Sequence, residues 1–505
     1  MPITPSCCLA SKSAPMDPPR SPTSAVTNLN GTEEASLIAG RGANAMERRI
    51  IRRVDWRLLP ILGVLYALAL IDRTNISIAR VVGMDKDLGL SVGARFSIVV
   101  GIYFIPYTLC QLPSNLLLRK VGPRKLLSFC VLSWGAAQFA MGFVPNWQLL
   151  AFLRALLGVL EAGFFPSLVY LISTWYTRHE VQTRLAIFYV VAIVLAGFSA
   201  FFGYAMSLLD GKLGIAGWAW IFIIEGALTI AFGILGCFCL PGFPHSNDFL
   251  TAEETVFVLD RVQHDRGDSL PDLLTWTKFV EAFDWRVAAY SVMFLCATMS
   301  TYGVGLFVSL ILRGLGWGVE ESLLLSAPPF IFAGITTVVS SRLSDHYRHR
   351  SLFILGQCIL AIIGWSLTGF APSGAWRYAG IFLSNAGSSG AVIGVLAYVS
   401  LGALRCPNAS INAFKSSNNI VSHSKRAIVS SVVISAGGIG GLIASNIFTQ
   451  ASAPRYIPGI LATIGSQVLL ILVLGCTTLY FRRENARSVR DCVALEGHPG
   501  FLYTL

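Results

Sequence analysis

Residues 58–79 decide the fold, with the sequence LLPILGVLYALALIDRTNISIA, in which an uncharged run from Leu58 to Ile71 is followed directly by Asp72 and Arg73. A hydrocarbon core about 30 Å thick is crossed by about 20 mostly apolar residues in a helix. The stretch is therefore long enough to span a bilayer, and it carries an acid and a base within that length.

Similar uncharged runs recur along nearly the whole chain. They lie near residues 96–118, 126–144, 149–175, 185–208, 218–240, 287–312, 323–341, 352–371, 378–401, 427–448 and 458–481. Only 13% of the residues are charged and 54% are hydrophobic, whereas soluble domains carry about 25% charged residues. The composition therefore predicts a protein that lies in lipid.

The longest polar interruption, 241–286, divides the twelve runs six and six. Many secondary transporters consist of two six-helix halves with the substrate site between them near the membrane midplane. We therefore predict an all-α membrane protein with twelve transmembrane helices in two six-helix bundles. The expected parts are a disordered cytosolic tail (1–50), a first bundle (51–240), a central cytosolic loop (241–286), a second bundle (287–482) and a cytosolic tail (483–505).

The net charge of +11 is placed in a way that indicates orientation. Lys and Arg cluster in alternate loops, beginning with Arg48, Arg49, Arg52, Arg53 and Arg57. Cytosolic loops of membrane proteins carry this excess of cations. We expect a multi-pass protein of the plasma membrane with both termini in the cytosol, and no nucleic-acid partner.

Charged side chains inside the expected spans are the candidates for function, because each costs at least about 2.5 kcal/mol at the bilayer centre. Asp72 and Arg73 lie in the first run, and Arg154 and Glu161 lie in the fourth. Seven residues are nearly two helical turns, so Arg154 and Glu161 share a face. An arginine is a permanent cation for a carboxylate, whereas a buried glutamate can bind a proton.

These residue types predict a proton-coupled anion site. The predicted substrate-binding residues are Arg73, Asn75, Arg154, Tyr302 and Asn385, and the predicted proton-coupling residues are Asp72 and Glu161. A static Arg154–Glu161 ion pair, Asp72 and Arg73 reaching the interface, and polar groups that only bond across helices remain as alternatives. Glu225 is expected to cap or pair near a membrane surface.

Two loops resemble the Gly-x-Leu-x-Asp-Arg-x-Gly-Arg-Arg loop of the major facilitator superfamily. The sequence SRLSDHYRHR at 341–350 contains Asp345 and Arg348, and Arg124 lies in the corresponding loop of the first half, where Arg119 replaces the usual Asp. Such a cationic loop can pair with an acidic helix end and hold the outward-open state. Alternatively, these cations only fix the topology.

Several motifs together resemble the fungal allantoate permease group of the anion:cation symporter family, within that superfamily. They are Asp55-Trp-Arg-Leu-Leu-Pro60, Asp72-Arg-Thr-Asn75, Glu161-Ala-Gly-Phe-Phe-Pro166, Trp175-Tyr-x-Arg178-x-Glu180-x-x-x-Arg184, Ile224-Glu225-Gly226, Lys425-Arg426-Ala427 and the segment 497–505. Arg184, Lys425 and Arg426 join Arg124, Asp345 and Arg348 as predicted gating residues.

The resemblance implies uptake of carboxylate-bearing solutes such as allantoate, nicotinate, pantothenate, biotin or aromatic acids, usually with a proton. In the distantly related vesicular glutamate transporters and sialin, the substrate arginine and an Arg/Glu pair fall on Arg73, Arg154 and Glu161. Residues 401–417 look inserted relative to this family, either as a genuine cytosolic loop or as a retained intron.

We therefore predict a proton-coupled symporter of a small organic anion, with protons and lipid as further partners, no metal, no cofactor and a monomeric state. A drug or metabolite exporter is an alternative, although residues 185–208 lack the Gly-Pro-x-x-Gly-Gly pattern. A membrane-embedded enzyme is disfavoured because no catalytic motif is present. A nutrient receptor that binds without transport also remains open.

Overall fold

The computed structural model describes residues 26–266, 285–347, 349–402, 423–448, 452 and 455–491. Within these ranges the regular structure is helical, without a strand. Contacts divide the chain into one unit that ends at Val54 and a second, compact unit from Asp55 onward. The packing and the site described below belong to the second unit.

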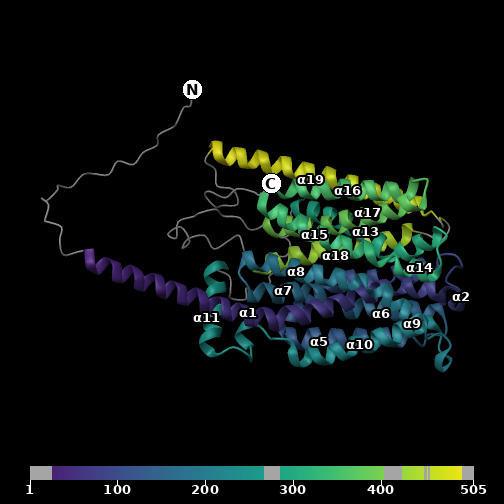
Figure 1. The fold of residues 1–505 in the computed structure, drawn as a ribbon, viewed down its shortest axis with the longest axis horizontal. Helices are drawn as coiled ribbons and strands as arrows, with labels where there is room; N and C mark the ends of the chain where they lie inside the picture. The colour runs from purple at the N-terminus through teal and green to yellow at the C-terminus, as the bar shows by residue number, and fades with distance from the viewer. Residues whose placement is uncertain are drawn as a thin grey trace. The chain divides into compact units, whose positions relative to one another are not determined.

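The helices in the first half of the chain lie between residues 26 and 266 (Figure 1). They are α1 (Val26–Ala79), η1 (Arg80–Met84), α2 (Asp85–Leu88), α3 (Arg95–Gly101), α4 (Phe104–Val121), α5 (Pro123–Met141), α6 (Trp147–Glu161), α7 (Phe164–Trp175), α8 (Arg178–Gly197), α9 (Ser199–Ser207), η2 (Lys212–Gly214), α10 (Gly217–Cys239), η3 (Pro244–Ser246) and α11 (Ala252–Arg266). The second half holds α13 (Trp285–Gly314), α14 (Val319–Leu324), α15 (Ala327–Tyr347), α16 (Arg350–Phe370), α17 (Gly374–Gly402), α18 (His423–Ile447) and α19 (Ile457–Asp491).

All twelve predicted runs fall on these helices. Ten helical segments of the described residues are long and apolar enough to cross a membrane. The other two runs correspond to α5, which begins with the charged Arg124 and Lys125, and α18, whose apolar part is Ser431–Ile447. Together with the ten segments, these two helices are consistent with twelve spans.

The structure differs from the sequence prediction at the ends of several elements. Helix α1 begins at Val26, inside the segment for which a disordered tail was predicted; the stretch contains alanine and glutamate, which favour helix. Helix α11 forms within the predicted central loop. Residues 267–284 and most of the predicted insertion lie outside the described residues. The domain boundaries stay a prediction.

Close helix packing in each half depends on glycines. In the second half, α16 and α17 lie side by side (Figure 1), and a Cβ atom on Gly364 would overlap the backbone of Ser384. In the first half, α5 and α10 are paired in the same way, and a Cβ on Gly226 would overlap the backbone of Phe139. Small residues let helices approach closely where lipid supplies little hydrophobic driving force.

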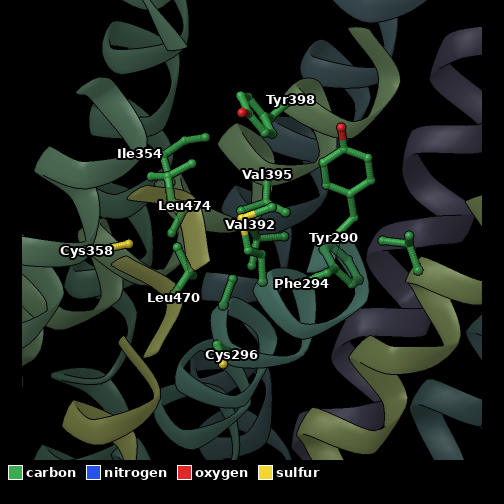
Figure 2. Close-up of a cluster of buried hydrophobic side chains, with 14 of the residues drawn as sticks. Tyr290, Phe294, Cys296, Ile354, Cys358, Val392, Val395, Tyr398, Leu470 and Leu474 are labelled. Carbon is green, nitrogen blue, oxygen red and sulfur yellow. The ribbon is translucent and has the colours of Figure 1, made fainter. Parts of the chain in front are cut away.

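A buried apolar cluster forms the core of the second half (Figure 2). Its labelled members are Tyr290, Phe294 and Cys296 of α13, Ile354 and Cys358 of α16, Val392, Val395 and Tyr398 of α17, and Leu470 and Leu474 of α19. Tyr189 of α8 packs against this cluster from the first half. The labelled members come from four helices of the second half, Val433 adds a fifth, α18, and the cluster also contacts the first half.

The two halves also meet through hydrogen bonds within the membrane. Asn115 of α4 donates to Ser431 of α18 over 2.9 Å, and Ser435 of α18 donates to Gln111 of α4 over 2.8 Å. Helix α8 packs against α15. The interface between the two halves is thus partly polar. A partly polar interface suits two bodies that separate and rejoin.

The first prediction concerns the α16–α17 contact. Replacement of Gly364 by alanine inserts a methyl group into backbone, so we expect the protein to lose about 1–3 kcal/mol of stability. The matched control is Gly356→Ala on the same helix, where a Cβ meets no atom within 4 Å. The measurement is the thermal unfolding midpoint of both variants in detergent, and equal midpoints would contradict this account of the packing.

Candidate functional site

A buried ion pair joins Arg73 of α1 to Glu161 at the end of α6. Their exposed fractions are 6% and 1%. The Nε of Arg73 donates to Oε1 of Glu161 over 2.8 Å, and its Nη2 donates to the same oxygen. Arg154 is the ion-pair partner of Glu161 that the sequence spacing allows, whereas Arg73 takes that position in the structure.

Three tyrosines complete the surroundings of this pair. The hydroxyl of Tyr107 accepts from Nη2 of Arg73 over 3.1 Å, and the hydroxyl of Tyr302 accepts from Nη1 over 2.9 Å. Tyr103 donates to Oε2 of Glu161 over 2.7 Å. The guanidinium carbon lies 4.8 Å from the ring centroid of Tyr107, within the range of a cation–π contact.

Tyr302 makes this a site between the two halves. It lies on α13, whereas Arg73, Glu161, Tyr103 and Tyr107 belong to the first half. A movement of one half against the other must therefore lengthen or replace the Arg73–Tyr302 hydrogen bond.

The local sequence explains how these groups meet. Gly158 lies close to the backbone carbonyl of Tyr103, which a Cβ at this position would overlap, so α6 can approach α4 one turn before Glu161. Tyr103 and Tyr107 are four residues apart, which places them on one helical face. That spacing within a run that lacks charge was the signal that sequence analysis missed.

The side chain of Asp72 contacts a second set of buried polar groups. Successive residues of a helix are about 100° apart, so Asp72 and Arg73 cannot face the same neighbours. The Oδ2 of Asp72 accepts from Trp134 Nε1 over 3.1 Å and lies 3.5 Å from the Thr229 hydroxyl. Arg154 donates to the backbone carbonyl of Asp72 over 3.3 Å.

Glu225 belongs to this region, contrary to the expectation that it caps or pairs near a membrane surface. Its exposed fraction is 5%, and its Oε2 has no hydrogen-bond partner among the described residues. It lies on α10, the same helix as Thr229, and within electrostatic range of Asp72. Glu225 lies several residues inside the run 218–240, and this position was the signal in the sequence that its side chain is buried.

The two predicted asparagines are buried without any hydrogen bond to Arg73. Both polar side-chain atoms of Asn75 lack a partner in the described part of the chain. The Oδ1 of Asn385 accepts from Ser389 over 3.5 Å. The structure thus brings Arg73, Glu161 and Tyr302 together and leaves Asn75 and Asn385 outside their hydrogen bonds. Across the described residues, no group of His, Cys, Asp or Glu has an arrangement that could hold a metal.

Arg184, a predicted gating residue, is held within the first half. It donates to both carboxylate oxygens of Asp55, over 2.7 and 3.1 Å, and lies 4.2 Å from the ring centroid of Tyr176. Glu180, which is 3.9 Å from Arg184, accepts two hydrogen bonds from Arg261 of α11, over 2.7 and 2.8 Å. These contacts tie the start of α8 to α1 and to the segment after α10.

Burial raises the pKa of Glu180, but the hydrogen bonds and charge of Arg261, with the charge of Arg184, outweigh burial and hold this pKa below its ordinary value. Because the pKa of Glu180 is lower in the folded state than in the unfolded state, its ionised side chain stabilises the fold at pH values above the unfolded-state pKa. This stabilisation is lost as the pH falls through the folded-state value.

Arg124 also contacts the segment after α10, where it donates to the Leu240 carbonyl over 2.7 Å and to Asp248 over 2.8 Å. Of the other predicted gating residues, Arg348 lies outside the described residues, as do the side chains of Asp345, Lys425 and Arg426. Their gating roles stay predictions.

The second prediction concerns the Glu180–Arg261 contact. A double-mutant cycle of Glu180→Gln and Arg261→Gln, followed by unfolding in detergent, should give a coupling energy of about 1 kcal/mol at neutral pH. The coupling should vanish in acid, because protonation removes the carboxylate charge. The exposed Glu484–Arg487 pair is the control, with coupling near zero. Coupling at Glu180 that persists unchanged in acid would contradict the prediction.

Comparison with known proteins places the chain in a family. A model of the Major Facilitator Superfamily matches residues 62–445. The MFS-type transporter cnsO of Penicillium expansum is 30% identical over 460 residues, which cover 88% of this chain and 85% of that protein. The high-affinity nicotinic acid transporter of Saccharomyces cerevisiae is 27% identical over 447 residues, covering 88% and 80%.

A solved structure shows the same fold. It is a bacterial homologue of the human lysosomal transporter Spinster, in an inward-facing and occupied conformation, with a TM-score of 0.60, 16% identity, and coverage of 84% of this chain and 97% of that one. Together with the helical spans, these matches confirm the predicted all-α fold of a multi-pass membrane protein. The chain belongs to the major facilitator superfamily, whose members are transporters of small molecules rather than enzymes.

Proposed function

We propose that this transporter takes up a small organic anion with a carboxylate group together with a proton, as a member of the anion:cation symporter family and its allantoate permease-like group. The observation that carries the proposal is Arg73, a buried cation held between the two halves by Glu161, Tyr107 and Tyr302. The similarity to a nicotinic acid transporter supports a carboxylate substrate.

Arg73 and Glu161 together account for coupling between anion and proton. Glu161 occupies the Nε and Nη2 edge of the guanidinium, which is the edge that a substrate carboxylate binds in bidentate geometry. The two carboxylates therefore compete. A proton from the solution forms an O–H bond on Glu161, removes its negative charge and frees the edge for the substrate.

Release follows from the reverse step. When Glu161 returns its proton to the cytosol, the restored carboxylate pairs again with Arg73 and displaces the anion. Tyr302 ties the guanidinium to the second half, so the exchange of carboxylates at Arg73 also changes a contact between the halves. Binding is thereby linked to the movement that exposes the site to the opposite side.

The other predicted residues keep supporting roles in this proposal. Asp72 is the second proton-coupling residue, and Asn75, Arg154 and Asn385 are the further substrate contacts. The gating residues are Arg124, Arg184, Asp345, Arg348, Lys425 and Arg426. We place the protein in the plasma membrane as a monomer with both termini in the cytosol.

The third prediction tests the anion site. Uptake of radiolabelled carboxylates, nicotinate among them, should fall about 10- to 100-fold in Arg73→Gln, because charge-assisted hydrogen bonds of about 1.5–3 kcal/mol are lost. Tyr302→Phe, which removes one neutral acceptor, should lose less. Arg487→Gln, an exposed arginine, is the control with wild-type uptake. Absence of uptake of every acid by the wild type would favour export or sensing.

The fourth prediction tests the coupling. Glu161→Gln cannot bind a proton, so its uptake should no longer be stimulated by acid or inhibited by a protonophore, while exchange of labelled for unlabelled anion persists. The readout is the ratio of uptake at acidic and neutral external pH, beside exchange in the same cells. Acid stimulation at the wild-type ratio in Glu161→Gln would rule out this residue as the coupling group.

A further inference from the structure

Three buried carboxyl groups of the first half lie beside two buried arginines. Asp72, Glu161 and Glu225 are at most 5% exposed, and the buried arginines beside them are Arg73 and Arg154. Arg80, which is also buried, pairs with Asp85 over 3.3 Å at the end of α1. Burying an unpaired charge is costly enough that the group binds a proton instead. These five groups comprise three carboxyl groups and two arginines, so one carboxyl group has no arginine to pair with and is expected to bind a proton.

Glu161 is not the group that needs this proton in the described conformation. Its two oxygens accept three hydrogen bonds, two of them from Arg73 and the third from Tyr103. Its negative charge is thus paired with the positive charge of Arg73. The surplus carboxyl group lies in the second buried region, where Asp72 interacts both with Arg154 and with Glu225.

The geometry of this second region brings the three groups together. Thr229, whose hydroxyl lies 3.5 Å from Asp72 Oδ2, is four residues after Glu225, so both side chains lie on one face of α10. Asp72 is the one ionisable group that interacts electrostatically with Glu225 among the described residues, and it interacts with Arg154 as well. Arg154 donates to the backbone of Asp72.

Each of these three side chains keeps a polar atom without a partner among the described residues. They are Oδ1 of Asp72, Nε and Nη2 of Arg154, and Oε2 of Glu225. A buried polar atom without a hydrogen bond costs about 1–3 kcal/mol. A proton on one carboxyl group turns an acceptor into a donor, which is what two neighbouring carboxylates lack.

Among the described residues, no cation interacts with Glu225. Helices α5 and α9 pack against α10; the cations of α5, Arg124 and Lys125, lie at its start, where Arg124 binds Asp248, and α9 contains no Lys or Arg. The η1 segment contributes Arg80, which is paired with Asp85 and lies 4.0 Å from the ring centroid of Phe96. Gly226 packs directly on the backbone of α5, so the position of Glu225 is rigid.

We propose that Glu225 binds a second coupling proton together with Asp72, in a buried site formed by Asp72, Arg154 and Glu225 that is separate from the Arg73–Glu161 site where the first proton binds. One proton is shared between the two carboxyl groups, and Arg154 balances the remaining charge. Binding forms one O–H bond with a proton from the solution, and release breaks that bond and returns the proton to the solution. The role in transport, but not the proton site itself, rests on the proposed function.

Infrared difference spectra of the purified full-length protein in nanodiscs test the site without any substrate. The wild type should show one C=O band of a protonated carboxyl group at neutral pH, which disappears on alkalinisation. Glu225→Gln should lose the band, because Asp72 is then the remaining carboxylate and keeps its charge beside Arg154. Arg154→Gln should increase the band about twofold, because two carboxyl groups then lack a cation.

Two further variants separate chemistry from folding. Glu225→Asp keeps a carboxyl group and should keep the band at a shifted frequency, and Asp248→Asn, at an exposed carboxyl outside the site, should leave it unchanged. Retention of the band in Glu225→Gln would overturn the proposal, including the case in which Asp72→Asn alone loses it. If Glu225→Gln cannot be purified, an unchanged band in Arg154→Gln overturns the shared site.

A transport assay tests whether this site takes part in the coupling of anion and proton transport. In proteoliposomes with nicotinate as the probe, Glu225→Gln should retain exchange and lose accumulation driven by a pH gradient. Accumulation at the wild-type level would overturn the role of Glu225 as a coupling group. If the wild type itself does not transport nicotinate or any other carboxylate, the proposed function fails, whereas the infrared result still decides whether the proton site exists.

Discussion

The burial of the Arg73 guanidinium constrains the rest of the structure. A permanent cation inside membrane-spanning helices must be paired and hydrogen-bonded, and Arg73 meets this need with Glu161, Tyr107 and Tyr302. These partners come from three other helices and both halves of the chain. The position of one charge on α1 thus brings α4, α6 and α13 to one point.

The neighbouring position on α1 organises a different set of contacts. Asp72 faces α5 and α10, where Trp134 and Thr229 approach its carboxylate. Because adjacent helical residues point about 100° apart, one Asp-Arg dipeptide serves two buried polar regions. One region contains a paired cation at the interface between the two halves. The other contains two carboxyl groups for one arginine, within the first half.

Glycine packing and polar contacts hold the helices together both within each half and between the halves. Glycine contacts hold α5 against α10 and α16 against α17, and the Asp55–Arg184 and Glu180–Arg261 pairs tie the first half to α11. The contacts between the halves include single hydrogen bonds such as Asn115–Ser431. Glycine packing also crosses between the halves, where a Cβ on Gly441 would overlap the ring of Phe104.

The twelve spans were predictable because an apolar run of membrane length has one stable outcome in lipid, a helix with its backbone hydrogen bonds satisfied internally. The candidate charges were predictable for the same reason, since a charge within such a run is rare and costly. The sequence by itself therefore determined the helices and the identity of Asp72, Arg73, Arg154 and Glu161 as candidates, while the domain boundaries stay a prediction.

Only the tertiary structure decided how these candidates pair. Arg154 and Glu161 share a face of α6, yet Glu161 bonds to Arg73, and Arg154 bonds to the backbone of Asp72. Tyr103, Tyr107 and Glu225 entered the sites although their runs gave no strong signal for them. The physical reason is that helical periodicity determines which way a side chain points, whereas the partner it meets depends on which helix crosses there.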